Sequence, residues 1–215
     1  MADFFLGLDL GQASDYTGLS ILERQGTDKP DYHLRHLERP KLGTPYPVIV
    51  NRVQELMLAQ PLKGNTVLAV DATGVGRPVV DLLEKAGLQP EAITITGGDV
   101  VSRDDQGGYH VPKRDLVTTL QVVFQAERLK IAEGLELAPV LIKELLAFRV
   151  KINLKTAHDS YEAWREGDHD DLVLSVALAV WAAERDFAGR GAFAMGRIYR
   201  GSGVPRPGLR GFTRW

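Results

Sequence analysis

Apolar and polar positions along the chain predict a domain in which helices pack on a mixed β-sheet. Three short strand patterns, at residues 4–10, 17–23 and 32–37, are separated by turns that contain Gly, Asp and Pro. Strands that follow one another this closely pair as an antiparallel meander. A helix, a strand, a second helix and a further strand come next, which implies parallel pairing in that half of the sheet. These four elements are expected at residues 46–59, 66–70, 78–86 and 92–96.

The rest of the chain is expected to be mostly helical. Residues 97–112 are interpreted as a glycine-rich loop, and residues 148–163 as a hairpin or a pair of extended segments. Helices are predicted at 113–130, 139–148 and 170–187, and the last is apolar nearly all round, which is typical of a buried helix. The helix at 113–130 is expected to turn four apolar side chains inward: Leu116, Leu120, Val123 and Phe124.

Composition predicts one folded domain with a basic tail. The 215 residues suit a single domain, which we place at residues 1–188. Residues 189–215 are rich in Gly and Arg, a composition that predicts a flexible segment. The formal net charge is −2 although six arginines follow the last acidic residue, so the domain itself is acidic. Nucleic-acid binders are usually basic, but a protein whose acids hold metal ions can still look acidic in sequence.

The sequence lacks cysteine, a membrane-spanning run and a signal peptide, and each absence excludes a class of protein or site. The chain has no cysteine, which excludes disulfides and thiolate metal sites. It has no apolar run of membrane-spanning length and no signal-peptide pattern at its start. We therefore expect no membrane partner and a cytoplasmic location, namely the bacterial host cytoplasm if the protein is encoded by a phage.

Acidic residues end two predicted strands and begin the last predicted helix. Asp9 ends the first strand and Asp71 the fourth, and an acidic cluster precedes the helix. In a sheet of this order the two strands can lie side by side, and a helix packed across the sheet brings its N-terminus to the same point. Carboxylates this close repel one another unless a cation joins them, and hard oxygen ligands suit Mg²⁺ or Mn²⁺. Two such ions about 3.5–4 Å apart can activate water and stabilise the leaving oxygen of a phosphodiester. The cluster before the helix is Asp168, Asp170 and Asp171.

Each acid also has a simpler interpretation. Asp168 or Asp170 suits a helix N-cap, and Asp71 before Thr-Gly suits a turn. We favour the metal site because acids occur together at three element ends. Asp168 and His169 are candidates for orienting a metal ligand, although a His at a helix start is more often a surface group.

Three runs surround these acids: FLGLDLG at residues 5–11, LAVDATG at 68–74 and GDHDDLV at 167–173, before an Ala-rich helix. Together they resemble the nuclease domain of phage large terminase subunits, which has the ribonuclease-H and RuvC-resolvase fold. The resemblance covers roughly residues 4–187 in element order and is most specific at the His-Asp-Asp helix start. It implies a ribonuclease-H-like mixed central sheet with helices on both faces.

The resemblance also implies an activity. It implies an endonuclease with two Mg²⁺ or Mn²⁺ ions that cuts double-stranded viral DNA during packaging, with a packaging ATPase or portal complex as partner. Its three acids map to Asp9, Asp71 and Asp171, with Asp170 beside them as a further ligand. A complete large terminase has an ATPase ahead of the nuclease, whereas this chain contains no Gly-x-x-x-x-Gly-Lys-Ser/Thr phosphate loop. We therefore expect an excised domain or a stand-alone relative, with the motor function outside this chain.

Basic residues supply candidates for DNA contacts. Within residues 149–155 polar and apolar residues alternate, and a period of two puts the polar set on one face of a strand. Such a face suits a phosphate backbone or is simply solvated, and two basic residues after the glycine-rich loop have the same two interpretations. The candidates are Arg149, Lys151 and Lys155 in the first group and Lys113 and Arg114 in the second.

Other function classes stay open. Residues 9–17 and 71–76 resemble the phosphate loops of actin-like and sugar-kinase-like ATP binders, but those proteins need two such domains. A DNA-binding module without activity would not need acids at all three positions. A resolvase or transposase of the same fold would also cut DNA. Nucleotide binding, compared with Mn²⁺-dependent DNA cleavage, separates the ATP binder from the nucleases.

Overall fold

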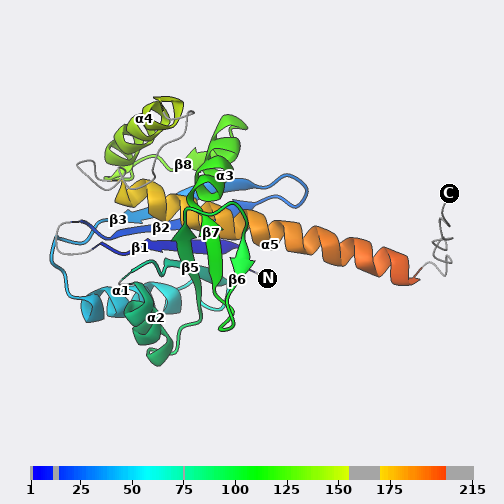
Figure 1. The fold of residues 1–215 in the computed structure, drawn as a ribbon, viewed down its shortest axis with the longest axis horizontal. Helices are drawn as coiled ribbons and strands as arrows, with labels where there is room; N and C mark the ends of the chain where they lie inside the picture. Colours follow the sequence, from blue (N-terminus) through cyan, green and yellow to red (C-terminus); the bar gives the residue numbers. More distant parts are fainter. Residues whose placement is uncertain (1, 12–14, 75, 155–169, 202–215) are drawn as a thin grey trace, which may run out of the picture. The chain divides into compact units, whose positions relative to one another are not determined.

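The computed structural model describes residues 2–11, 15–74, 76–154 and 170–201, without the side chains of residues 147–154 and 190–201. The described residues form one mixed, eight-stranded sheet with helices on both faces (Figure 1), which confirms the predicted α/β fold. In spatial order the strands are β6 (Ser102–Arg103), β7 (Tyr109–Pro112), β5 (Pro90–Thr96), β4 (Thr66–Asp71), β1 (Phe4–Asp9), β2 (Gly18–Gln25), β3 (Asp31–Glu38) and β8 (Leu129–Ile131).

The directions of the strands bring most of their carboxyl ends to one edge of the sheet. β1, β2 and β3 form the predicted antiparallel meander. β4 pairs in parallel with β1, and β5 in parallel with β4, as the strand–helix order predicts. β7 is parallel to β5, and β8 is parallel to β3. Except for β2 and β6, all strands therefore end at the same edge, called here the carboxyl edge, where open α/β sheets usually bind their ligands.

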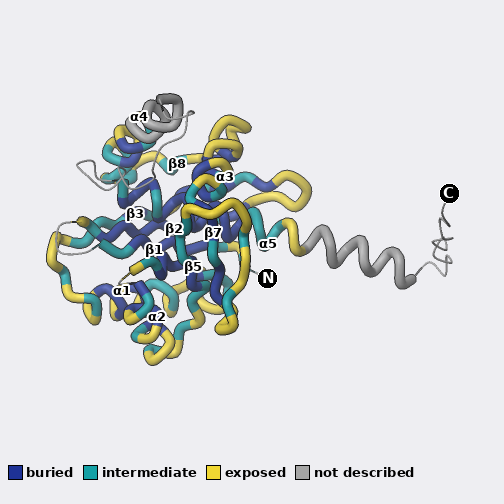
Figure 2. Tube along the Cα trace, in the orientation of Figure 1, coloured by how far each residue is buried: buried dark blue, intermediate teal, exposed yellow. Residues whose placement is uncertain are grey.

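Two hydrophobic cores lie on opposite faces of the sheet. Leu6 and Leu8 of β1 belong to the core that includes α1 and α2, whereas Phe5 belongs to the core that includes α3, α4 and α5. Figure 2 shows the buried positions along the central strands. Because side chains alternate along a strand, Gly7 and Asp9 share the face of Phe5. The helices are α1 (Tyr46–Leu58), α2 (Gly76–Lys85), α3 (Lys113–Gln125), α4 (Ala138–Leu154) and α5 (Asp171–Gly201).

The structure corrects the expectations for residues 97–130. The predicted glycine-rich loop contains β6 and β7, and the predicted helix at 113–130 ends at Gln125 and is followed by β8. Three of the four side chains expected to point inward from α3 are buried, but Phe124 is 50% exposed. Phe124 lies in the last turn of α3, where the chain leaves the helix to enter β8.

The structure also corrects the interpretation of residues 148–163. α4 continues to Leu154, so the extended conformation is wrong for residues 148–154. The alternation there has a period of two, but the segment contains no Gly or Pro that would end the preceding helix. Residues 155–163 lie outside the described residues.

α5 reaches beyond the predicted domain boundary. It begins at Asp171 and continues to Gly201, so the backbone of residues 190–201 is helical. The chain divides into two compact units, Met1–Ala183 and Glu184–Trp215. The domain at 1–188 and the flexibility of 189–215 stay predictions. None of the described helices is both long and apolar enough to cross a membrane.

A charged cluster at the end of β3 makes stability depend on pH. The Glu38 carboxylate contacts the His36 ring at 2.6 Å and accepts hydrogen bonds from Arg52 of α1. Mainly through His36, these contacts lower the pKa of Glu38 from 4.5 to about 2. A carboxylate with a lowered pKa stabilises the fold above its ordinary pKa, and this contribution disappears as the pH falls from 4.5 to about 2. Between pH 4.5 and about 2, the free energy of unfolding should therefore fall less in Glu38→Gln than in the wild type. Urea denaturation at several pH values measures this free energy.

Glu55→Gln is the matched control. Glu55 also contacts Arg52, but its side chain is 70% exposed, so this variant should keep the pH dependence of the wild type. A pH dependence in Glu38→Gln that equals the wild type would contradict the expectation.

Candidate active site

Two aspartates end neighbouring strands at the carboxyl edge. The parallel register of β1 and β4 runs up to the residue before each aspartate, so Asp9 and Asp71 come next on the two strands. Side chains alternate along a strand, so Asp9 lies on the same face of β1 as Phe5, and Asp71 on the same face of β4 as Ala69. Phe5 and Ala69 belong to the core that includes α5, so both aspartates face that helix. Each aspartate is only 8% exposed. The Asp71 carboxylate accepts a hydrogen bond from the backbone N–H of Thr73 at 2.8 Å, which orients it.

Two glycines, one on β1 and one on β2, allow α5 to pack directly on these two strands. Gly18 of β2 is the register partner of Asp9, and a Cβ atom at Gly18 would lie 2.3 Å from the carbonyl oxygen of Asp171. A Cβ atom at Gly7 of β1 would lie 1.9 Å from the carbonyl oxygen of Ser175, one turn further along α5. No side chain fits at these distances, so the start of α5 lies directly on the β1–β2 pair. This packing places Asp171, which is 5% exposed, at the end of β1.

Asp9 lies at the electrostatic centre of the acidic cluster. Burial raises the pKa of Asp9 well above 3.8, and the carboxylates of Asp71, Asp171 and Asp170 raise it further. Lys113, the first residue of α3, acts in the opposite direction. Four of the five acids singled out in the sequence therefore share one region, and the ionised form of Asp9 is disfavoured without a cation.

Two charged residues at this site, the largely buried Arg39 and the buried Glu144, were not predicted from the sequence. Arg39, just after β3, donates a hydrogen bond to Glu144 of α4, and its guanidinium lies 3.5 Å from the Asp171 carboxylate. Glu144 also accepts a hydrogen bond from the backbone N–H of Val173 at 3.3 Å. Strand direction could have located Arg39, because β3 runs parallel to β1 and ends at the carboxyl edge. Glu144 has no sequence signal, because only the packing of α4 brings it to the site.

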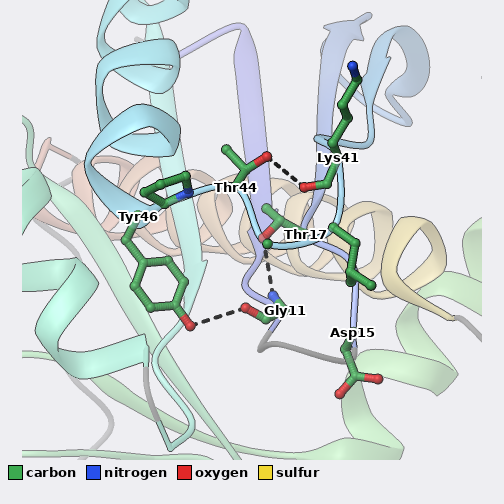
Figure 3. Close-up of a pocket in the computed structure, with 9 residues that line it drawn as sticks. Gly11, Asp15, Thr17, Lys41, Thr44 and Tyr46 are labelled. Atoms are coloured by element: carbon green, nitrogen blue, oxygen red, sulfur yellow. Dashed lines mark hydrogen bonds between the residues drawn. The ribbon is translucent and has the colours of Figure 1, made fainter.

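A pocket of about 190 Å³ opens beside the end of β1 (Figure 3). It lies between the loop after β1 and the loop that connects β3 to α1. Two hydrogen bonds fix Gly11 in this pocket. Its N–H donates to the Thr17 hydroxyl at 3.2 Å, and its carbonyl accepts from the Tyr46 hydroxyl at 3.1 Å. Gly11 is two residues beyond Asp9, but none of the clustered aspartates lines the pocket. The lining residues are Gly11, Asp15, Thr17, Lys41, Leu42, Gly43, Thr44, Pro45 and Tyr46.

Solved structures with a similar fold include two viral nuclease domains. The large terminase nuclease from the thermophilic phage G20c is 19% identical with a TM-score of 0.51, and the similarity covers 82% of this chain and 80% of that chain. The human cytomegalovirus terminase nuclease domain is 14% identical with a TM-score of 0.50, and the similarity covers 87% of each chain. This chain has the fold of a terminase nuclease domain. The predicted ribonuclease-H-like architecture is thereby confirmed.

Apart from the three short runs around the acids, the similarity to terminase nucleases is one of structure. No protein-family model matches the chain, and no curated protein matches its sequence. The roles of individual residues therefore depend on the geometry and electrostatics of this chain.

The acidic cluster of this terminase-nuclease fold fits a divalent cation by its chemistry. Its donors are carboxylate oxygens, the ligands that Mg²⁺ and Mn²⁺ prefer, and a cation would remove the repulsion that raises the pKa of Asp9. Among the described residues, no three His, Asp or Glu side chains already stand close enough together to hold an ion.

The two basic residues at the start of α3 have different surroundings. Lys113 is close enough to the cluster to affect the pKa of Asp9. Arg114 forms an ion pair with Asp99 at 2.6 Å and also donates a hydrogen bond to the Asp99 carbonyl. Only Lys113 is therefore placed at the site.

Two of the other predicted basic residues lie in a helix rather than in a strand. The backbone of Arg149 and Lys151 belongs to α4, so the expected strand conformation is wrong there. Their contact with DNA stays a prediction. Lys155, Asp168 and His169 lie outside the described residues.

Proposed function

We propose that this chain is a metal-dependent endonuclease that hydrolyses phosphodiester bonds of double-stranded DNA. One observation supports this most strongly: acids from β1, β4 and the start of α5 meet around Asp9 at the carboxyl edge of a terminase-nuclease fold. In this proposal Asp9, Asp71 and Asp171 are the catalytic ligands of two Mg²⁺ or Mn²⁺ ions. Asp170 is an additional ligand or orients one, and Asp168 and His169 stay candidates for orienting the ligands.

The residues of the site have separate tasks in this mechanism. Two divalent ions, when bound, activate the attacking water and stabilise the leaving oxygen. Asp9 and Asp71 supply ligands from adjacent strands, whose pairing fixes their separation, and Asp171 supplies a ligand from α5. Lys113 contacts a phosphate oxygen and so orients the DNA backbone over the carboxylates. No side chain acts as a nucleophile, so no covalent protein–DNA intermediate forms.

We infer cleavage of viral DNA during genome packaging as the biological role. Two structures with this fold are terminase nucleases, one from a phage and one from cytomegalovirus. In this role the nuclease acts together with an ATPase motor, whose phosphate-loop motif this chain does not contain, or with a portal complex. The site of action is then the cytoplasm of the infected bacterium.

Incubation of the purified chain with supercoiled plasmid tests the activity. We expect nicked and linear DNA with Mn²⁺ or Mg²⁺ and intact plasmid with EDTA. A synthetic four-way junction in a parallel reaction separates a terminase-type nuclease from a resolvase, which would cut the junction in preference to duplex DNA. Protein that cuts no DNA with either ion, but binds ATP with micromolar affinity, would contradict the proposal.

Lys113 and Arg114 offer a matched test of the phosphate contact. Lys113→Gln should weaken binding to every DNA sequence and reduce the slope of log affinity against log salt by about 1, since one counterion fewer is released. Fluorescence anisotropy over a range of salt concentrations, without divalent metal, measures this slope. Arg114→Gln should keep the wild-type slope because Arg114 is paired with Asp99. Identical slopes in the wild type and Lys113→Gln would rule out the contact.

A further inference from the structure

Arg39 connects three separate parts of the chain beside the acidic cluster. Its guanidinium lies over the Tyr16 ring at 5.2 Å, donates a hydrogen bond to Glu144 and approaches the Asp171 carboxylate to 3.5 Å. Only 15% of the Arg39 side chain is exposed. The loop before β2, the helix α4 and the start of α5 therefore all contact the guanidinium of Arg39.

Glu144 completes this arrangement from α4. One of its carboxylate oxygens accepts the hydrogen bond from Arg39, and the other accepts the backbone N–H of Val173 at 3.3 Å. The N–H groups in the first turn of a helix have no partner within the helix, and a carboxylate there also interacts favourably with the helix dipole. Glu144 therefore holds both Arg39 and the turn of α5 that begins with Asp171.

We propose that Arg39 and Glu144 are a pair of positioning residues, in which Arg39 orients the Asp171 carboxylate for metal binding and Glu144 prevents the arginine charge from competing with the metal. This inference rests on the proposed function of the acidic cluster. Neither residue is a metal ligand or touches DNA in this account. Both act through Asp171.

The two residues have opposite effects on a cation at the site. Arg39 offsets repulsion among the carboxylates and holds Asp171 in place, but an uncompensated positive charge at this distance would also repel Mg²⁺ or Mn²⁺. Glu144 compensates that charge. Arginine suits the position better than lysine, because a planar guanidinium can contact two carboxylates while it stacks on the Tyr16 ring.

The variants should therefore fail in different ways. Arg39→Gln should lower cleavage about 10–100-fold, the range typical for residues that orient metal ligands, and Arg39→Lys should recover little of it. Glu144→Gln should raise the metal concentration for half-maximal cleavage about tenfold, with a smaller change in the rate at saturating metal. The double variant Arg39→Gln/Glu144→Gln should need less metal than Glu144→Gln alone, because the uncompensated arginine is gone.

Two metal titrations of the whole chain measure these effects: plasmid cleavage, and the rise in Tm caused by Mn²⁺, which needs no activity. Arg52→Gln is the control, because it removes an arginine from a more exposed pair with Glu38 and should keep the wild-type metal dependence. Circular dichroism confirms that each variant is folded. Three results overturn the inference: wild-type cleavage in folded Arg39→Gln, wild-type metal dependence in folded Glu144→Gln, or a double variant that needs as much metal as Glu144→Gln. Wild-type protein that neither cuts DNA nor gains stability from Mn²⁺ overturns the proposed function, and this inference with it.

Discussion

Replacing Asp9, Asp71 or Asp171 with asparagine should lower plasmid cleavage at least about 10³-fold, because each change removes a charged metal ligand and metal catalysis supplies several kcal/mol. The fold should survive, since asparagine nearly preserves the shape of aspartate. Without metal, Asp9→Asn should even raise the Tm at neutral pH. The raised pKa of Asp9 means that its ionised form costs free energy in the folded state, and this cost grows as the pH rises above the ordinary pKa. Asparagine does not ionise and so avoids the cost.

Two further variants make this prediction specific. Asp170→Asn should be milder than Asp171→Asn if Asp171 is the bridging ligand, and the order reverses if Asp170 bridges the ions. Asp104→Asn is a control outside the cluster, because Asp104 pairs with Arg77 and accepts hydrogen bonds from its own loop. It should leave the cleavage rate unchanged. Full activity in Asp9→Asn or Asp71→Asn would contradict the assigned roles.

Replacing Gly7 or Gly18 with alanine should destabilise the protein. Comparing the two variants should distinguish an effect on stability from an effect on cleavage. Each added Cβ atom would overlap a carbonyl oxygen of α5, and such overpacking costs about 1–3 kcal/mol and at times more. For a chain of this size 1 kcal/mol corresponds to about 2–4 °C in Tm. We therefore expect the Tm, measured by circular dichroism, to fall by about 2–12 °C.

The two glycine variants should differ in activity. The added Cβ atom in Gly18→Ala would overlap the backbone of Asp171. We therefore expect the molecules that remain folded to cut DNA more slowly than the wild type. Gly7→Ala acts one turn further along α5 and should slow cleavage less. Gly97→Ala is the control, since nothing lies within 4 Å of its added Cβ atom. A Tm equal to that of the wild type in both Gly7→Ala and Gly18→Ala would show that α5 does not lie against β1 and β2 as described.

The positions of Asp9 and Asp71 could be predicted from the sequence, because each ends a continuous apolar run. The meander and the strand–helix order then determine that these two strands pair in parallel. Asp171 could be placed at the same edge because the helix that follows it is apolar nearly all round and must be buried. Local patterns were sufficient for these elements because their burial leaves a strong periodic signal.

The remaining features depend on contacts between distant parts of the chain. β7 has only the four residues Tyr109–Pro112 and follows two glycines, so its strand conformation depends on pairing with β5. The alternation within residues 149–154 indicates a strand by period alone, whereas the backbone continues the helix α4. Arg39 and Glu144 reach Asp171 only when β3, α4 and α5 are packed together. Strand direction places Arg39 at the carboxyl edge, but single-sequence patterns contain no record of its contacts with Glu144 and Asp171.

Anomalous scattering from Mn²⁺-soaked crystals of the chain shows whether the acidic cluster binds two metal ions. We expect two manganese peaks about 3.5–4 Å apart, with ligands from Asp9, Asp71 and Asp171 and with Asp170 beside them. Under the same conditions the soaked protein should cut plasmid DNA. Manganese bound only outside the acidic cluster, in protein that still cuts DNA, would rule out the proposed metal site.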